Sequence, residues 1–503
     1  MDPGGRVGVV VGGGIAGLAA AWELSGRPEV RTVVVLEADD RLGGKIHTAQ
    51  VGGHVVDLGP DAFLARRPEA VALCREIGIA DELTAPGSRR AYVWSRGKLR
   101  ALPEGLALGI PTRIGPVLRS GILPFHGLAR AGLDLIAVSP AWRTRRSRPT
   151  SPAGATPDRA IGDIVRSCLG PQVVDRFVDP LIGGIHAGPV DAMSAAAVYP
   201  PLLEAAARPG SLLRALRRVT PPAGPPDAPV FLTPRAGLGR LTDALAAALG
   251  RRGVRLRTSS PVTALEHAGA RWRLQIGPGG LEEADVVVLA TPAPVSARLL
   301  GPLDPETSVL LSTTEYASVA VLTFVVPASA VGRHLDGTGF LVPAVEQWLT
   351  TACTWMSAKW PHLPTGGDVV IRASVGRFGD ERAAALGDDD LLSAVWAELA
   401  PVLRITGTPA AALVTRWHDA FPQYAVGHLE RVAAVERGVD ALGAIALAGA
   451  AYRGVGIPAC IASGRRAARR VLGIDEPLSG AEARAVARQT VAAYEAGRRA
   501  EPS

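Results

Sequence analysis

The chain contains 503 residues, of which 48% are hydrophobic and 20% are charged, and its formal net charge is +7. This composition can bury a large core and excludes a wholly disordered chain, and at about 100–200 residues per domain the length predicts two to four domains. The positive charge points only weakly to an anionic ligand or membrane surface, and without zinc-finger spacing or abundant aromatics no nucleic-acid partner is expected.

The first predicted elements are a strand, a helix and a second strand. Residues 6–11 (RVGVVV) are an apolar, β-branched run typical of a buried parallel strand. Residues 18–24 (LAAAWEL) favour a helix, and residues 31–36 (RTVVVL) predict the second strand. The segment after the first strand matches G-x-G-x-x-G with Gly12, Gly13, Gly14, Ile15, Ala16 and Gly17. This order predicts a dinucleotide-binding unit. A signal peptide is not expected, because a triple glycine would weaken its helix.

Each part of this unit has a physical role. Gly12 permits the tight turn, Gly14 lets a pyrophosphate approach the backbone, and Gly17 lets the helix pack close to the strand. The helix N-terminus offers free N–H groups to the phosphates. Glu37 ends the second strand, where a carboxylate can bind both ribose hydroxyls and disfavours a 2′-phosphate. The unit therefore favours FAD or NAD over NADP.

The next segment distinguishes flavin from nicotinamide. Residues 37–45, which include Glu37, Ala38, Arg41, Gly44 and Lys45, resemble the E-x(3)-R-x-G-G signature of the FAD enzymes in the amine oxidase, phytoene desaturase and protoporphyrinogen oxidase superfamily. The two cations can balance pyrophosphate charge, and the glycines let the backbone meet the cofactor. The resemblance implies non-covalently bound FAD.

A second turn resembles one branch of this superfamily. Gly59, Pro60, Asp61 and Ala62 are similar to the G-P-D-S turn of the porphyrinogen oxidases, which lies by the flavin. Ala62 stands where serine is usual, so a side-chain hydrogen bond there is not expected. Arg66 and Arg67 follow the turn and are our candidates for binding substrate propionates.

The resemblance to bacterial porphyrinogen oxidases extends over about residues 6–470. It rests on six further segments, at 102–112, 178–188, 340–343, 359–361, 416–429 and 448–463. The first of these resembles the branch that acts on coproporphyrinogen III in monoderm bacteria. The resemblance implies oxidation of coproporphyrinogen III to coproporphyrin III, with O2 as acceptor and H2O2 as product, in haem biosynthesis by the coproporphyrin-dependent route.

Alternatives stay open beside this prediction. A protoporphyrinogen IX oxidase would use the same chemistry, and an amine oxidase or a carotenoid desaturase would share the superfamily. A non-catalytic flavoprotein scaffold would bind FAD without oxidising a porphyrinogen. Peripheral membrane contact, transfer of the product to a haem-pathway ferrochelatase and the oligomeric state are also left open.

The later segments supply further cofactor candidates. In the resembling family the position of Val262 offers backbone bonds to the adenine, and that of Trp417 offers a flat face near the flavin. The C-terminal flavin segment contributes Gly449, Val455, Gly456 and Ile457, before a helix predicted at 460–472 whose N-terminus could face the flavin. We assign no catalytic acid or base, because the cofactor performs the redox chemistry.

Because the flavin segments are dispersed, the FAD domain is expected to be discontinuous. The predicted fold is α/β, with a Rossmann-like FAD-binding domain, a mixed-sheet α+β substrate domain and a helical insertion with helices at 116–138 and 158–168. The expected divisions are 1–89, 216–302 and 413–475 for FAD binding, 90–215 for the membrane-facing type of insertion, 303–412 for substrate and 476–503 for a helical tail.

Four cysteines lie far apart along the chain, at Cys74, Cys168, Cys353 and Cys460, without a CxxC pair. Neither a disulfide framework nor a metal site is expected. No run of 18 apolar residues predicts a transmembrane helix. We therefore expect a cytoplasmic protein.

Overall fold

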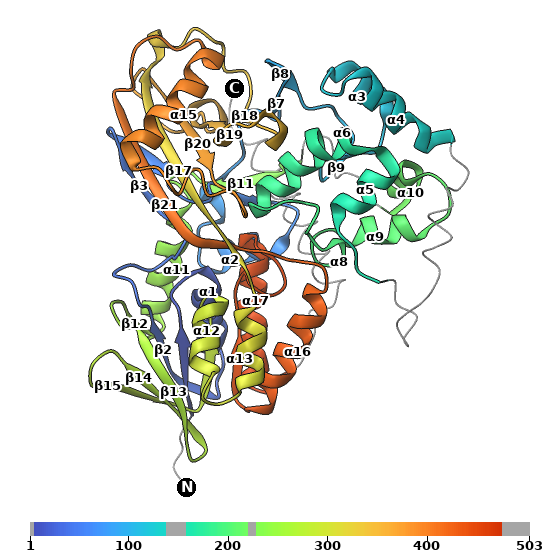
Figure 1. Cartoon of the computed structure of the whole chain (residues 1–503). Helices are drawn as coiled ribbons and strands as arrows, with labels where there is room; N and C mark the ends of the chain where they lie inside the picture. The colour runs from blue at the N-terminus through green and yellow to red at the C-terminus, as the bar shows by residue number, and fades with distance from the viewer. Residues whose placement is uncertain (1–4, 137–156, 220–227, 475–503) are drawn as a thin grey trace.

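The computed structural model describes residues 5–136, 157–219 and 228–474. A nucleotide-binding part lies at the bottom of Figure 1, a second sheet above it and a group of helices to the right. The helical tail predicted at 476–503 lies wholly outside the described residues. So do residues 139–156, a basic stretch with four arginines, and residues 220–227, a Pro-rich stretch.

A five-stranded parallel sheet is the centre of the nucleotide-binding part. Its strands, in order across the sheet, are β12 (Arg255–Arg257), β2 (Val30–Leu36), β1 (Arg6–Val11), β16 (Val286–Leu289) and β22 (Ile445–Leu447). Val9, Val10 and Val11 are all buried because both faces of the sheet are covered, which explains the unbroken valine run. The late strands β16 and β22 join β1 in one sheet, which confirms the predicted α/β class.

Different elements cover the two faces of this sheet. One face packs against α1 (Ile15–Ser25), α2 (Pro68–Glu76), α11 (Gly239–Arg251) and α17 (Ile457–Val471). The other packs against β13 (Val262–Ala268), β14 (Arg271–Ile276), β15 (Gly280–Ala284), α12 (Ala293–Leu300), α13 (Pro305–Ser312) and α16 (His428–Ala441). Gly464 of α17 meets α1 so closely that a Cβ there would lie 2.0 Å from the Ala16 carbonyl oxygen. The middle of α17 is therefore held directly against the first turns of α1.

A seven-stranded mixed sheet forms the second part. Its order is β21 (Ala411–Pro422), β17 (Tyr316–Pro327), β20 (Asp368–Val375), β19 (Thr350–Trp355), β18 (Gly339–Leu341), β7 (Tyr92–Ser95) and β8 (Lys98–Ala101). It packs against α15 (Asp388–Leu403), and β17 and α14 (Met356–Lys359) pack against the hairpin of β3 (Thr48–Val51) and β4 (His54–Asp57). Strand β21 runs through residues 412 and 413, between which we expected one domain to end and the next to begin. The predicted division of the chain into domains stays a prediction.

The small strand β11 (Phe231–Pro234) pairs with β5 (Phe63–Leu64) and with β6 (Leu83–Thr84). They bring the segment after residue 228 back beside the turn that follows Gly59 and Pro60. The chain thus re-enters the nucleotide-binding part after the helical insertion.

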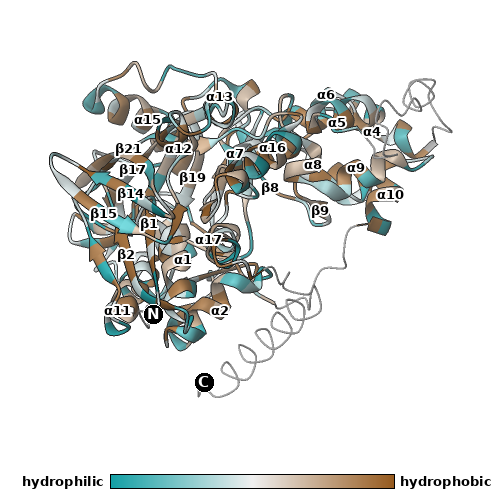
Figure 2. Ribbon diagram, turned by 90° about the horizontal axis from the view of Figure 1, so that it is seen from below, coloured by the Kyte–Doolittle hydropathy of each residue, from teal (hydrophilic) through white to brown (hydrophobic). Residues whose placement is uncertain are grey.

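The helices to the right of Figure 1 enclose a separate core, and Figure 2 shows them from below as a lobe beside the sheets. They are α3 (Ile114–Ser120), α4 (Phe125–Ile136), α5 (Ile161–Leu169), α6 (Pro171–Val173), a π-helix (Val174–Gly183), α7 (Gly184–His186), α8 (Ala195–Val198), α9 (Pro200–Ala207) and α10 (Leu212–Val219), with the strands β9 (Leu106–Ala107) and β10 (Ile110–Pro111). The continuous helix predicted at 116–138 is wrong, because left-handed Gly121 (φ 64°) ends α3 and Pro124 follows.

Within the described ranges, every helix is too short or too polar to cross a bilayer.

Candidate functional site

A cavity of about 800 Å³ lies where the strands β1 and β2 end and extends to the seven-stranded sheet. This volume is at the upper end of the roughly 300–1,000 Å³ of ligand pockets, and ligands of open α/β sheets bind at the carboxyl ends of the strands. The predicted cofactor residues that line it are Gly12, Gly14, Ile15, Ala16, Glu37, Ala38, Arg41, Gly44, Lys45, Gly59, Pro60, Ala62, Val262, Trp417, Gly449, Val455, Gly456 and Ile457. The structure thus brings together segments that lie far apart in the chain.

The glycine-rich turn has the geometry that its spacing requires. Gly12 has a φ of 108°, and a Cβ there would lie 2.7 Å from the Ala290 carbonyl oxygen. A Cβ at Gly17 would lie 1.9 Å from the Gly12 carbonyl oxygen, so Gly17 serves close packing and does not line the cavity. A Cβ at Gly14 would have no heavy atom within 4 Å. Gly14 therefore leaves open space where a ligand can approach the backbone.

Glu37 is held at the end of β2 by backbone N–H groups. Its Oε2 accepts from the Gly13 N–H at 2.5 Å, and its Oε1 accepts from the Asp39 N–H at 2.9 Å. Gly13 itself does not line the cavity. It positions the carboxylate that does, and each oxygen of that carboxylate keeps a lone pair for a ribose hydroxyl.

The turn that contains the second glycine pair lies against the first. The Gly43 N–H donates to the Gly13 carbonyl at 2.9 Å, and Arg41 donates to the Gly44 carbonyl at 2.6 Å. Lys45 lines the cavity, and loss of hydration among the surrounding protein atoms lowers the pKa of its ammonium group. A bound anion would favour its charged form.

Asp61 lies behind the cavity wall and does not line it. Its Oδ2 accepts from Lys359 Nζ at 2.7 Å and from Trp360 Nε1 at 3.1 Å, and Arg372 lies 3.5 Å from Oδ1. Burial raises the pKa of this carboxyl, but the two cations outweigh burial and hold the pKa well below its usual range. Arg372 also donates to the Gly59 carbonyl at 2.9 Å. Asp61 therefore supports the turn at Gly59 and Pro60 from behind.

The C-terminal segments form a further part of the cavity wall. Trp417 Nε1 donates to the Leu58 carbonyl at 2.9 Å, which fixes the indole beside Gly59. The Tyr424 hydroxyl donates to the Ala450 carbonyl at 2.5 Å and accepts from the Gly454 N–H at 2.8 Å. These bonds hold the loop that leads into α17.

The residues present fit an elongated dinucleotide such as FAD. The N-termini of α1 and α17 both line the cavity, and neither has a side-chain capping bond, so their first N–H groups are available to a ligand. A Cβ at Gly449 would, as at Gly14, have no heavy atom within 4 Å. One helix can face a pyrophosphate and the other an electron-rich ring edge.

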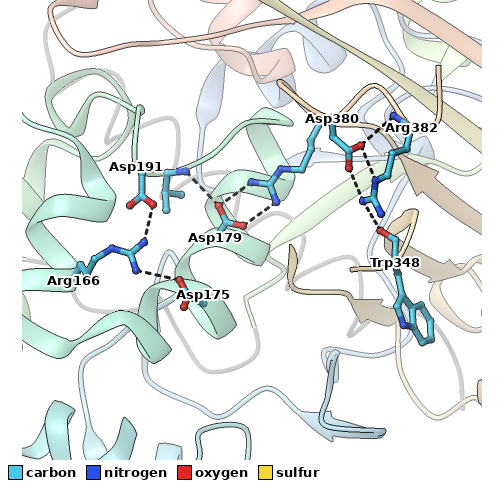
Figure 3. Close-up of polar contacts among 9 residues, drawn as sticks. Arg166, Asp175, Asp179, Asp191, Trp348, Asp380 and Arg382 are labelled. Carbon is cyan, nitrogen blue, oxygen red and sulfur yellow. Dashed lines mark hydrogen bonds and ion pairs between the residues drawn. The ribbon is translucent and has the colours of Figure 1, made fainter. Parts of the chain in front are cut away.

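The remainder of the cavity lies between the seven-stranded sheet and the π-helix. It is lined by Asp179, Pro180, Gly183, Tyr316, Val342, Pro343, Trp348, Thr350, Thr351, Arg372, Ser374, Arg377, Asp380 and Arg382, among others. Arg377 forms two hydrogen bonds of 3.0 Å to Asp179, and Arg382 pairs with Asp380 and with the Trp348 carbonyl (Figure 3).

Sequence reasoning missed these charged residues. Asp179 lies in the family-like segment 178–188, which could have drawn attention to it, whereas no motif marks Arg377. Arg66 and Arg67 are exposed and do not line the cavity, and Arg67 pairs with Glu69 at 3.1 Å. The structure therefore places other arginines nearer to a bound substrate.

Comparisons with known proteins agree with this geometry. The family model described as flavin containing amine oxidoreductase matches residues 15–472. The chain belongs to the flavin-containing amine oxidoreductase family. It is an oxidoreductase of this family, and its cofactor is FAD.

Relatives in this family have long matches to the chain. A coproporphyrinogen III oxidase of Bacillus subtilis is 32% identical and the match covers 93% of this chain and 98% of that protein. One of Mycobacterium tuberculosis is 36% identical, with 92% and 96% covered. The human protoporphyrinogen oxidase is 29% identical, with 94% and 99% covered. A crystal structure assigned to a protoporphyrinogen oxidase of Exiguobacterium has a TM-score of 0.80 at 31% identity, covering 93% and 99% of the two chains.

Proposed function

We propose that the chain is an oxygen-dependent coproporphyrinogen III oxidase of haem biosynthesis. The observation that carries the proposal is one continuous cavity, which runs from the open backbone at Gly14 to walls made by Val342, Pro343 and the π-helix. Such a cavity can place a dinucleotide and a large apolar ring in contact. Relatives named coproporphyrinogen III oxidase, with matches over almost the whole chain, support this substrate.

The roles of the residues follow from their positions. When bound, FAD supplies a two-electron acceptor that takes a hydride from a meso carbon and is returned to its oxidised state by O2, which leaves as H2O2. Glu37 binds the ribose, the α1 N-terminus and Lys45 hold the pyrophosphate, and the α17 N-terminus faces the flavin. Trp417 and the turn at Gly59 hold the ring system in place and exclude water.

Anaerobic mixing of the purified holoprotein with coproporphyrinogen III tests the proposal. We expect the flavin absorption band to bleach, and admission of air to restore it together with porphyrin fluorescence. Three cycles remove six electrons and give coproporphyrin III. An unchanged flavin band would contradict the proposal.

The same assay with protoporphyrinogen IX separates the main alternative. That substrate carries two propionates instead of four, and faster turnover of it than of coproporphyrinogen III would favour a protoporphyrinogen IX oxidase. Amine or carotenoid oxidation would require bleaching by those substrates and none by either porphyrinogen.

Contact with anionic membranes and transfer of the product to a ferrochelatase are further parts of the proposal. Leu118, Phe125 and Leu133, which are exposed on α3 and α4, support a peripheral contact. Co-sedimentation with anionic and neutral vesicles tests it, and binding to neither kind would contradict it.

A further inference from the structure

We propose that the Asp179 carboxylate binds the pyrrole N–H groups of the substrate and accepts protons from them during oxidation, while Arg377 holds that carboxylate in place. The inference rests on the proposed function and assigns the proton acceptor that this function needs. It concerns the wall of the cavity that the π-helix supplies.

The π-helix presents Asp179 to the cavity together with Pro180 and Gly183, and Gly184 of α7 follows directly. Short π-helical segments are often found at functional sites because the extra residue redirects side chains. The two glycines have no side chain that could stand between the carboxylate and a flat ligand. Asp179 is thus the charged group on a wall of otherwise small or apolar residues.

The hydrogen bonds of Asp179 leave it one favourable acceptor position. Its Oδ1 accepts from Arg377 Nη2 at 3.0 Å and from the Val190 N–H at 3.3 Å. Among the described residues, its Oδ2 accepts one hydrogen bond, from Arg377 Nη1 at 3.0 Å. A carboxylate oxygen has two lone pairs, so Oδ2 can accept a further N–H donor without loss of the ion pair.

Contacts along the wall place this pair beside the expected flavin position. Arg377 follows Gly376, where a Cβ would lie 3.2 Å from the Val319 Cα. Val319 is paired with Trp417 across β17 and β21, and the Trp417 ring lies against Gly59. A ring bound between Trp417 and the π-helix would therefore meet the Asp179 carboxylate.

The other carboxylates that line the cavity are less suited to this role. No histidine is found among the described residues that line it. Glu37 and Asp39 lie at the nucleotide end of the cavity. Asp380 is bound by three N–H groups of Arg382 (Figure 3), and the Arg382 side chain is 52% exposed, so this pair is open to solvent.

The chemistry requires such an acceptor. In each cycle a meso C–H bond breaks and its electron pair leaves as hydride to FAD while a proton is drawn from the ring that becomes cationic, so that loss of the acceptor slows the hydride step itself. Over three cycles the substrate loses three hydrides from meso carbons and three protons, two from pyrrole nitrogens and one from the remaining meso carbon. When an N–H bond breaks, its electron pair forms the new C=N bond and Asp179 takes the proton, then releases it to solvent. A carboxylate is basic enough because the cationic ring is strongly acidic.

The substitution Asp179→Asn tests the proposal, because the amide oxygen still accepts from Arg377 but cannot accept a proton. We expect the limiting rate of flavin bleaching by coproporphyrinogen III to fall about 100-fold. Coproporphyrin III, which keeps two N–H groups, should bind the holoprotein about tenfold more weakly, as measured by quenching of its fluorescence. The matched control is Asp175→Asn in the same π-helix, because Asp175 pairs with Arg166 and does not line the cavity. It should change neither quantity.

Two results would overturn the proposal while leaving the proposed function intact. One is an unchanged bleaching rate in Asp179→Asn, and the other is tighter binding of coproporphyrin III, which would mean that Arg377 binds propionates instead. If Asp179→Asn loses FAD or melts early, Asp179→Ala with added formate replaces it, and restored bleaching supports the proposal while failure to restore it contradicts it. If the wild-type protein itself does not bleach, the proposed function fails as well.

Discussion

Lys359 Nζ lies 2.7 Å from Asp61 Oδ2, in a buried ion pair behind the turn at Gly59 and Pro60. The pair joins α14, which directly follows β19 of the seven-stranded sheet, to a turn that lines the cavity. It therefore couples the two sheets at the position where the cofactor is expected.

Removal of the cation should destabilise the fold. Lys359→Met leaves the Asp61 carboxylate with the Trp360 Nε1–H donor at 3.1 Å and with the Arg372 cation at 3.5 Å, and loss of one partner of a buried pair costs about 3–5 kcal/mol. We expect the free energy of unfolding, measured by urea unfolding at pH 7, to fall by an amount near the lower end of this range. The control Arg208→Met removes an exposed pair with Glu204 and should cost less than about 1 kcal/mol. Equal losses in the two variants would contradict this role.

Asp61 also predicts a dependence of stability on pH. Because its folded-state pKa is lowered, its contribution is present above the unfolded-state pKa and is lost as the pH falls toward the folded pKa. As the pH falls, the free energy of unfolding of the wild type should therefore decrease more steeply than that of Asp61→Asn. Identical slopes of stability against pH below pH 4 in the two proteins would contradict this.

Asp57 should have the opposite effect. Its pKa is raised to about 6, mainly by burial and in part by Asp61, although the Thr48 hydroxyl lowers it. The protonated Asp57 carboxyl contributes to the free energy of unfolding below the unfolded-state pKa, and this contribution is lost as the pH rises through about 6. The loss amounts to roughly 3 kcal/mol at pH 8. Both bonds to Asp57, from Thr48 and from the Leu238 N–H, fall on Oδ1, which an asparagine can reproduce. Asp57→Asn should be more stable than wild type at pH 8, by a margin that shrinks toward pH 4, and a constant margin would argue against it.

The open space at Gly14 predicts a specific loss of cofactor. Gly14 has φ −71° and ψ 174°, which alanine adopts without strain, and a Cβ there meets no protein atom within 4 Å. Gly14→Ala should melt like the wild type once FAD is removed, yet bind FAD at least about tenfold more weakly because the methyl group occupies the space of the phosphate. Gly250→Ala, at a similarly open site on α11, should bind FAD normally. Titration of the two FAD-free variants with FAD measures their affinities for the cofactor. Equal affinities of Gly14→Ala and Gly250→Ala would contradict the placement of the pyrophosphate.

The crossing of α1 and α17 predicts a different outcome for Gly464. A Cβ there would lie 2.0 Å from the Ala16 carbonyl oxygen, so Gly464→Ala must move the helices apart at a cost of about 1–3 kcal/mol. Because both N-termini line the cavity, FAD affinity should fall together with the melting temperature. A variant that melts normally and still loses FAD would argue against this explanation.

Much of the nucleotide site could be predicted because its signals are local. The valine run of β1, the three glycines around Gly14 and the carboxylate of Glu37 lie within about 30 residues, and each has a backbone or hydrogen-bonding reason that does not depend on distant contacts. The Gly449–Ile457 loop could be connected to this unit only through a family resemblance, since no periodicity reveals that β22 pairs with β16.

The substrate side of the cavity depends on tertiary contacts. Arg66 and Arg67 follow a cofactor turn in sequence but point to solvent, whereas Arg377 reaches the cavity because a π-helix about 200 residues earlier supplies its partner Asp179. Asp61 was expected to touch the cofactor and instead lies behind the wall, because two cations from the other sheet bind it there. Short-range steric and hydrogen-bonding rules act along the chain and can be recognised in the sequence, but the pairing of buried charges is decided only when separate elements pack together.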